Sequence, residues 1–154
     1  MLDQLKRIFG AEPEAVGVLA TREPIELATA ALLIEMSRSD FSESAAEKEA
    51  VRHLLQRRFA LDDAALERLL AEAARRADSA VSLHEFTHRL NKELPEADKL
   101  AILEMLWRVS NADGHIDKHE EYLIQRVAGL LHISDRDRVR LKLKVVVEGS
   151  SGNS

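Results

Sequence analysis

The chain has 154 residues, of which 45% are hydrophobic and 32% are charged, and its formal net charge is −5. This acidic balance disfavours a nucleic-acid partner, because binding to the phosphate backbone needs a basic surface. The absence of cysteine excludes disulfides, thiolate metal sites and a cysteine nucleophile. The sequence shows no signal peptide and no apolar run approaching the ~18 residues of a membrane span. We therefore expect a cytoplasmic protein without stable membrane insertion.

Helix start and stop signals follow one another along the first half of the chain. A short amphipathic segment at residues 2–9 is followed by a predicted loop at residues 11–22. Pro24 suits the first turn of a helix. Ser44 has Glu47 three residues later, which is the spacing of a capping box. The helices predicted in this half cover about residues 2–9, 24–38, 45–59 and 63–78.

The second half of the chain carries similar signals. Ser82 with Glu85 and Asp117 with Glu120 have capping-box spacing, and Ser134 is a further N-cap candidate. The helices predicted here cover about residues 83–90, 95–111, 118–131 and 135–147. The sequence therefore predicts eight helices and no strand.

The last predicted helix contains a segment with some strand character. Residues 138–145 alternate basic and apolar side chains with a period of two. A single strand would have no partner here, and Val139, Leu143 and Val146 also recur at helical spacing, so we predict a helix. Its basic side chains are interpreted as a solvated helix face rather than a nucleic-acid surface. Residues 148–154 are predicted to form a disordered tail.

One helix-turn-helix unit occurs twice, near residues 31–59 and 104–131. In each copy an aspartate ends one helical pattern and a glutamate seven residues later opens the next. The matched positions are Asp40 and Glu47 in the first copy, and Asp113 and Glu120, each 73 residues later, in the second. The repeat predicts one all-α domain over residues 1–147 with a pseudo-two-fold arrangement. We expect the two acidic turns to lie close together at one end of the molecule.

The acidic turns have two interpretations. Clustered carboxylates suit hard cations, so one interpretation is a weak site for Ca²⁺ or Mg²⁺. Its predicted ligands are Asp40, Glu47, Asp113, Asp117 and Glu120. The spacing is not that of an EF-hand, since Gly114 follows the first aspartate directly. The other interpretation is structural, with Gly114 at positive φ, Asp117 as an N-cap and Glu120 completing the capping box.

A second motif, His84-Glu85-x-x-His88, matches the pattern of zinc metalloproteases. Helical geometry puts both histidines away from the apolar face of their helix, so we expect them to face solvent, where they could still contact a metal. Glu85 is better explained as the capping partner of Ser82. A metal-dependent hydrolase using this motif or the acidic cluster is the alternative function, although the chain lacks a Gly-rich phosphate loop and an evident nucleophile.

Several short segments together resemble a known family. The segments are Leu-Trp-Arg-Val at 106–109, Ala-Asp-Gly at 112–114, Glu-Glu at 120–121, Ser-Asp-Phe at 39–41 and Phe-Thr at 86–87. Over about residues 24–147 the chain resembles the TerB-like tellurite resistance proteins. The resemblance implies a bacterial, cytoplasmic, all-helical domain without established catalytic residues. The characteristic acidic positions of the family correspond here to Asp40, Glu47, Asp113 and Glu120.

The function expected from this resemblance is a non-enzymatic interaction module in a bacterial tellurite or metal-stress response. Its partners would be proteins whose identity the sequence does not give, and a divalent cation would bind at the acidic turns. We expect no catalytic residues and no bound organic cofactor.

Overall fold

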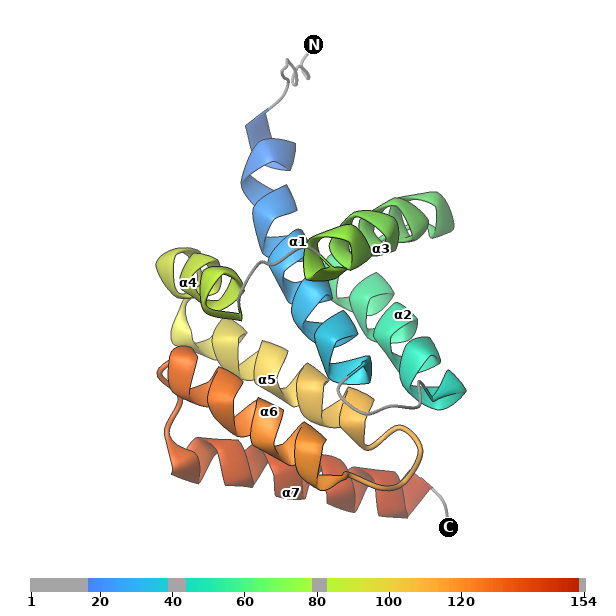
Figure 1. Ribbon diagram of the computed structural model, residues 1–154, viewed down its shortest axis with the longest axis vertical. Helices are drawn as coiled ribbons and strands as arrows, with labels where there is room; N and C mark the ends of the chain where they lie inside the picture. Colours follow the sequence, from blue (N-terminus) through green and yellow to red (C-terminus); the bar gives the residue numbers. More distant parts are fainter. Residues whose placement is uncertain (1–16, 39–43, 79–82, 153–154) are drawn as a thin grey trace.

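The computed structural model describes residues 17–38, 44–78 and 83–152, and this part of the chain is helical, without a strand (Figure 1). The all-α prediction is therefore confirmed. The helices are α1 (Gly17–Ser37), α2 (Ala45–Phe59), α3 (Asp63–Asp78), α4 (Leu83–Glu93), α5 (Glu96–Ser110), α6 (Lys118–Leu130) and α7 (Asp135–Gly152). The helix predicted at residues 2–9 lies outside the described residues. None of the described helices is both long and apolar enough to cross a membrane.

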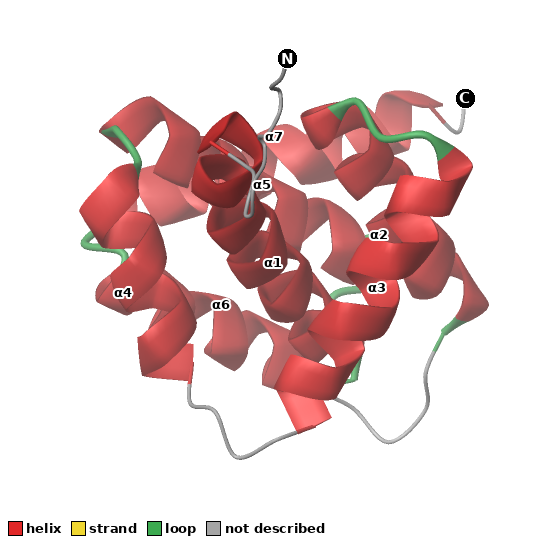
Figure 2. Ribbon diagram, turned by 90° about the horizontal axis from the view of Figure 1, so that it is seen from above, coloured by secondary structure: helices red, strands yellow, loops and turns green. Residues whose placement is uncertain are grey.

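α1 is the central helix, and α2, α3, α4 and α5 pack around it (Figures 1 and 2). From Ala28 to Met36 every residue except Glu35 is buried. A helix that is apolar on all sides belongs in the interior, so this composition explains its place. The hydroxyl of Thr29, the polar exception among these buried residues, donates to the Ile25 carbonyl at 2.8 Å.

The start of α1 differs from the prediction. The helix begins at Gly17, so the loop predicted for residues 11–22 is wrong from this residue onward, and Pro24 lies inside the helix. Proline prefers the first turn because no backbone donor is lost there, whereas inside a helix it removes one hydrogen bond. A proline inside a helix costs free energy but is not forbidden. Here the burial of apolar side chains from Ala28 to Met36 offsets the lost hydrogen bond.

Three helices meet at one corner through buried polar contacts. Lys99 of α5, which is 9% exposed, donates from Nζ to the Leu131 carbonyl at 3.0 Å and to Asn91 Oδ1 at 3.2 Å. Asn91 of α4 in turn donates from Nδ2 to the Leu130 carbonyl at 2.7 Å. The cation and the amide thus satisfy carbonyls at the C-terminus of α6, where positive charge is favoured.

α7 lies at the edge of the molecule and packs on α5 and α6 (Figure 1). The segment is helical as predicted, but its buried residues are Leu141 and Val145, whereas the sequence pattern pointed to Val139, Leu143 and Val146. A long-range contact sets this face. The fully buried Trp107 of α5 donates from Nε1 to the Arg138 carbonyl at 3.2 Å, and residues three and seven positions after Arg138 lie on the same side of the helix.

The C-terminal end of α7 also departs from the prediction. Where a disordered tail was expected, the helix continues to Gly152. Two contacts hold this end against the end of α5. Glu148 pairs with Arg108 at 2.6 Å, and Gly149 approaches Asn111 so closely that a Cβ at Gly149 would lie 2.9 Å from Asn111 Nδ2.

Candidate functional site

The two copies of the helix-turn-helix unit have matching helix boundaries on either side of the turn. α1 ends at Ser37 and α2 begins at Ala45, while α5 ends at Ser110 and α6 begins at Lys118, each 73 residues later. Ser37 and Ser110 also make equivalent hydrogen bonds, because the hydroxyl of each donates to the carbonyl three residues earlier in its own helix, at 2.9 and 3.0 Å. The resemblance between the copies thus extends from sequence to local hydrogen bonding.

The glutamates of the two acidic turns face the interior. Glu47 and Glu120 are each 1% exposed. Their backbone N–H groups donate to the N-cap side chains, to Ser44 Oγ at 3.2 Å and to Asp117 Oδ1 at 2.8 Å. Glu120 completes the predicted capping box, since its Oε1 accepts from the Asp117 N–H at 3.2 Å. Burial of a carboxylate is costly unless it is hydrogen-bonded, and the capping box meets part of this need for Glu120.

The exposed part of the second acidic turn is Asp113. Its Oδ1 accepts the backbone N–H of His115 at 3.0 Å, and the following Gly114 has φ +85°, the left-handed conformation predicted from the sequence. Asp40, the matching residue of the first turn, lies outside the described residues. Figure 1 shows α1 and α5 ending towards the same side of the molecule. The expected closeness of the two turns stays a prediction.

The predicted cation ligands therefore fall into different environments. Glu47 and Glu120 are buried, Asp117 is an N-cap, Asp113 is exposed, and Asp40 lies outside the described residues. Within residues 17–38, 44–78 and 83–152, no three His, Cys, Asp or Glu side chains are grouped so that they could hold one metal ion. A cation at the acidic turns remains an expectation from the sequence.

The His-Glu-x-x-His motif lies on α4, where both histidines are exposed to solvent as predicted and Glu85 is exposed as well. The two imidazole rings are stacked, with their centroids 6.5 Å apart and their planes inclined by 16°. Phe86 and Leu90, on the other side of the helix, are buried. The motif therefore lies on the surface of α4, and Ser82, the predicted capping partner of Glu85, lies outside the described residues.

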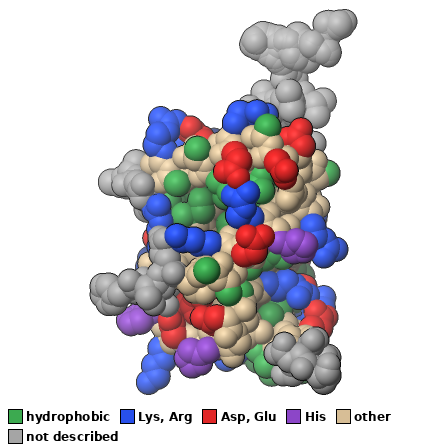
Figure 3. Space-filling view, turned by 90° about the vertical axis from the view of Figure 1, so that its right-hand side faces the viewer, with side chains coloured by type: hydrophobic (Ala, Val, Ile, Leu, Met, Phe, Trp, Pro, Cys, Tyr) green, Lys and Arg blue, Asp and Glu red, His purple; other side chains and the backbone are tan. Residues whose placement is uncertain are grey.

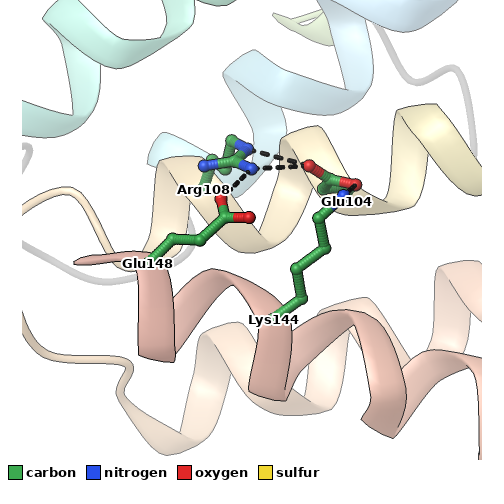
Figure 4. Close-up of polar contacts among 4 residues, drawn as sticks. All are labelled: Glu104, Arg108, Lys144 and Glu148. Carbon is green, nitrogen blue, oxygen red and sulfur yellow. Dashed lines mark hydrogen bonds and ion pairs between the residues drawn. The ribbon is translucent and has the colours of Figure 1, made fainter. Parts of the chain in front are cut away.

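A polar network that the sequence does not predict joins α5 to α7 (Figure 4). Glu104 accepts from Arg108 Nη2 at 2.6 Å and from Lys144 Nζ at 3.1 Å, and the same Nη2 donates to Glu148 at 2.6 Å. Partial burial alone would raise the pKa of Glu104, but the hydrogen bonds from Arg108 and Lys144 outweigh it and lower the pKa. The i,i+4 spacing of Glu104 and Arg108 was visible in the sequence, whereas the contacts across 40 residues were not.

Beside this network lies a surface hollow of about 310 Å³ between α2, the end of α5 and α7. It is lined by Ala50, His53, Leu54, Arg108, Asn111, Ala112, Val145, Glu148 and Gly149. The guanidinium of Arg108 is neutralised by Glu104 and Glu148, so this hollow offers no ready anion site.

The outward side of α7 has a different character. Val139, Leu143 and Val147 are 43%, 57% and 61% exposed and, at a spacing of four residues, lie along one side of the helix. Arg136 and Arg140, three residues before Val139 and Leu143, are exposed beside them. We call these five residues the outer face of α7. The face of the molecule shown in Figure 3 instead carries acidic, basic and hydrophobic side chains intermixed.

Comparison with known proteins agrees with this architecture. No curated protein and no solved structure matches the chain. The family model described as tellurite resistance protein TerB matches residues 26–143, which is more than half of the chain. The chain therefore belongs to the TerB family of tellurite resistance proteins.

Proposed function

We propose that this chain is a non-enzymatic interaction module of a bacterial tellurite or metal-stress response, and that it binds an acidic helical segment of a partner protein through the outer face of α7. The observation that carries the proposal is the row of three exposed aliphatic side chains on α7. Single exposed apolar residues are ordinary, whereas a row at i, i+4 and i+8 matches the apolar stripe that one amphipathic helix offers to another.

Charge selects the kind of partner. Residues 136–144 contain five basic side chains and one acidic side chain, in a chain whose net charge is −5. Four of the five pair with acidic side chains of the chain itself, and only Arg136 makes no ion pair with any residue that the structure describes. An acidic partner would meet the unpaired Arg136 directly and would compete for the exposed Arg140. A partner with glutamates or aspartates beside its apolar stripe would complement this face. A second copy of the chain would bring the same cations together, so electrostatics disfavours self-association here.

We further propose that a divalent cation, Ca²⁺ or Mg²⁺, binds weakly at the acidic turns. The exposure of Asp113 supports this, since a hydrated cation can reach its carboxylate. Because Glu120 is a buried capping residue, Asp113 and Asp117 would be the main contacts in the second turn. The alternative of a metal-dependent hydrolase is less well supported, because His84 and His88 lie on the outer side of α4 and not in a cleft.

A defined peptide tests the proposed interaction. The probe is a helical peptide with leucines at i, i+4 and i+8 and glutamates flanking them, and the matched control peptide has lysines in place of the glutamates. We expect the acidic peptide to shift backbone amide NMR signals of α7 and the basic peptide to leave them in place. Leu143→Asp should abolish the shifts, whereas Tyr122→Ser should not, because Tyr122 is an equally exposed residue of α6 (63%).

Two further results would contradict the proposal. Equal binding of both peptides would show that charge does not select the partner. Binding of α7 to vesicles containing phosphatidylglycerol, without binding to the acidic peptide, would assign this face to a membrane surface instead. In a bacterium that lacks its own copy of the gene, the wild-type chain and Tyr122→Ser should restore growth on tellurite, and Leu143→Asp should not.

A further inference from the structure

We propose that His84 and His88 form a two-histidine site on α4 for a borderline divalent transition metal such as Cu²⁺, Ni²⁺ or Zn²⁺. Both side chains are exposed, and their rings stack with centroids 6.5 Å apart and planes inclined by only 16°. Residues at i and i+4 of a helix project from the same side, one turn apart. Rotation of the two exposed side chains about χ1 and χ2 can turn one nitrogen of each ring towards a common point, where one metal ion binds both at about 2.0–2.1 Å.

The backbone that carries the two rings is fixed at several points. Phe86 and Leu90 anchor the inner side of α4 in the core. Between the histidines, the Thr87 hydroxyl donates to the Leu83 carbonyl at 3.0 Å, and Asn91 attaches the helix to the end of α6 at 2.7 Å. A fixed helix holds the two Cα atoms one turn apart, so the second nitrogen binds after side-chain rotation alone, without ordering of the backbone.

The donor set determines the class of metal. Imidazole nitrogen suits Zn²⁺, Cu²⁺ and Ni²⁺, whereas Ca²⁺ and Mg²⁺ prefer oxygen ligands. No third His, Cys, Asp or Glu joins the pair within the described part of the chain, so water would fill the remaining positions. A closed structural zinc site has four protein ligands and a catalytic one usually has three. The pair is therefore a site for exchangeable metal, and Cu²⁺ should bind most tightly of the three ions.

A second pair of histidines, four residues apart in the sequence, allows the helical geometry of the first pair to be tested. His115 and His119 have the same sequence spacing, but α6 begins only at Lys118, so His115 precedes the helix and the two are not one helical turn apart. If spacing along the sequence were enough, both pairs would bind metal alike. If helical geometry is required, only the pair on α4 binds as a chelate.

The test uses the untagged full chain and Ni²⁺. At roughly a hundredfold excess over its dissociation constant, Ni²⁺ should raise the melting temperature of the wild-type chain by about 5–10 °C. His84→Ala and His88→Ala should each weaken Ni²⁺ binding by at least roughly tenfold, because one ligand of the chelate is lost. Both variants should melt as the wild type does without metal, since both side chains are exposed.

The double variant of His115→Ala and His119→Ala is the matched control and should bind Ni²⁺ as the wild type does. The proposal is overturned if either single variant on α4 keeps wild-type affinity, or if the control variant loses it. It is also overturned if Ca²⁺ stabilises the chain through His84 and His88 as strongly as Ni²⁺ does. Broadening of the ring NMR signals of both histidines by Cu²⁺ gives a readout that does not depend on stability.

Discussion

Replacement of Glu104 by glutamine tests the polar network that joins α5 to α7. The Glu104 side chain is 20% exposed and accepts hydrogen bonds from Arg108 and Lys144. Glutamine keeps the shape of the side chain but removes its charge, so the packing is preserved and both ion pairs are lost. Arg108 would retain Glu148 as its carboxylate partner, whereas Lys144 would lose its partner within the network.

The expected loss follows from the exposure of the pairs. Ion pairs at the surface contribute about 0–1 kcal/mol each, and the partial burial of Glu104 and Arg108 places these towards the upper end. Glu104→Gln should therefore lower the free energy of unfolding by about 1–2 kcal/mol. For a domain of this size, that corresponds to a fall in melting temperature of about 2–8 °C.

The lowered pKa of Glu104 predicts how the stability difference between wild type and Glu104→Gln changes with pH. The folded-state pKa of Glu104 lies below its ordinary value of 4.5, because the hydrogen bonds from Arg108 and Lys144 outweigh the effect of burial. A carboxyl whose pKa is lowered by folding stabilises the protein fully above its unfolded pKa and loses that contribution as the pH falls through its folded pKa. The stability difference between wild type and Glu104→Gln should thus be constant from about pH 6 to pH 7 and shrink below about pH 4.5.

Urea unfolding followed by circular dichroism at several pH values measures this difference. Glu67→Gln is the matched control, since Glu67 pairs with Arg52 between α3 and α2 but its side chain is 60% exposed. The control should lose less than about 0.5 kcal/mol. Equal losses in both variants, or a Glu104→Gln deficit that persists unchanged at about pH 3, would refute the reasoning.

Three further variants test the C-cap of α2, the polar contacts of Lys99 with α4 and the end of α6, and the second acidic turn. Ala60→Gly should raise the free energy of unfolding by about 0.5–1 kcal/mol in urea unfolding, because Ala60 ends α2 with φ 53°, a left-handed conformation that glycine adopts without strain. Lys99→Met should lower it by about 2–3 kcal/mol, since the buried Leu131 carbonyl and the partly buried Asn91 Oδ1 lose their donor. Ca²⁺ at about 10 mM should raise the melting temperature, and Asp113→Asn should remove this gain; a melt that does not respond to Ca²⁺ would reject the cation site.

Local signals in the sequence were sufficient to place most helices. The sequence predicts Ser44 and Asp117 as N-caps, and α2 and α6 begin directly after them, because a cap acts on backbone donors within three residues. The positive φ of Gly114 is predicted correctly because it also depends on a local feature, the end of α5. The solvent exposure of His84 and His88 followed from helical periodicity alone, since Phe86 and Leu90 bury the other side of α4.

Features set by distant contacts could not be predicted. The buried side of α7 depends on the hydrogen bond from Trp107 to the Arg138 carbonyl, and its final turns are held by Arg108 and Asn111 of the α5 end. No local pattern contains this information. The burial of Glu47 and Glu120 was missed for a related reason: a capping box shows where a helix starts but not which side of that start faces the core.

The central position of α1 has a consequence for synthesis of the chain. α1 is made before the helices that bury it, and its partners α3, α4 and α5 end only at Ser110. Until then, a ribosome-bound chain exposes the aliphatic row from Ala28 to Met36 to other molecules. Since domains generally fold as units during synthesis, α1 acquires its protection late, and the nascent chain passes through a period in which chaperone binding competes with aggregation.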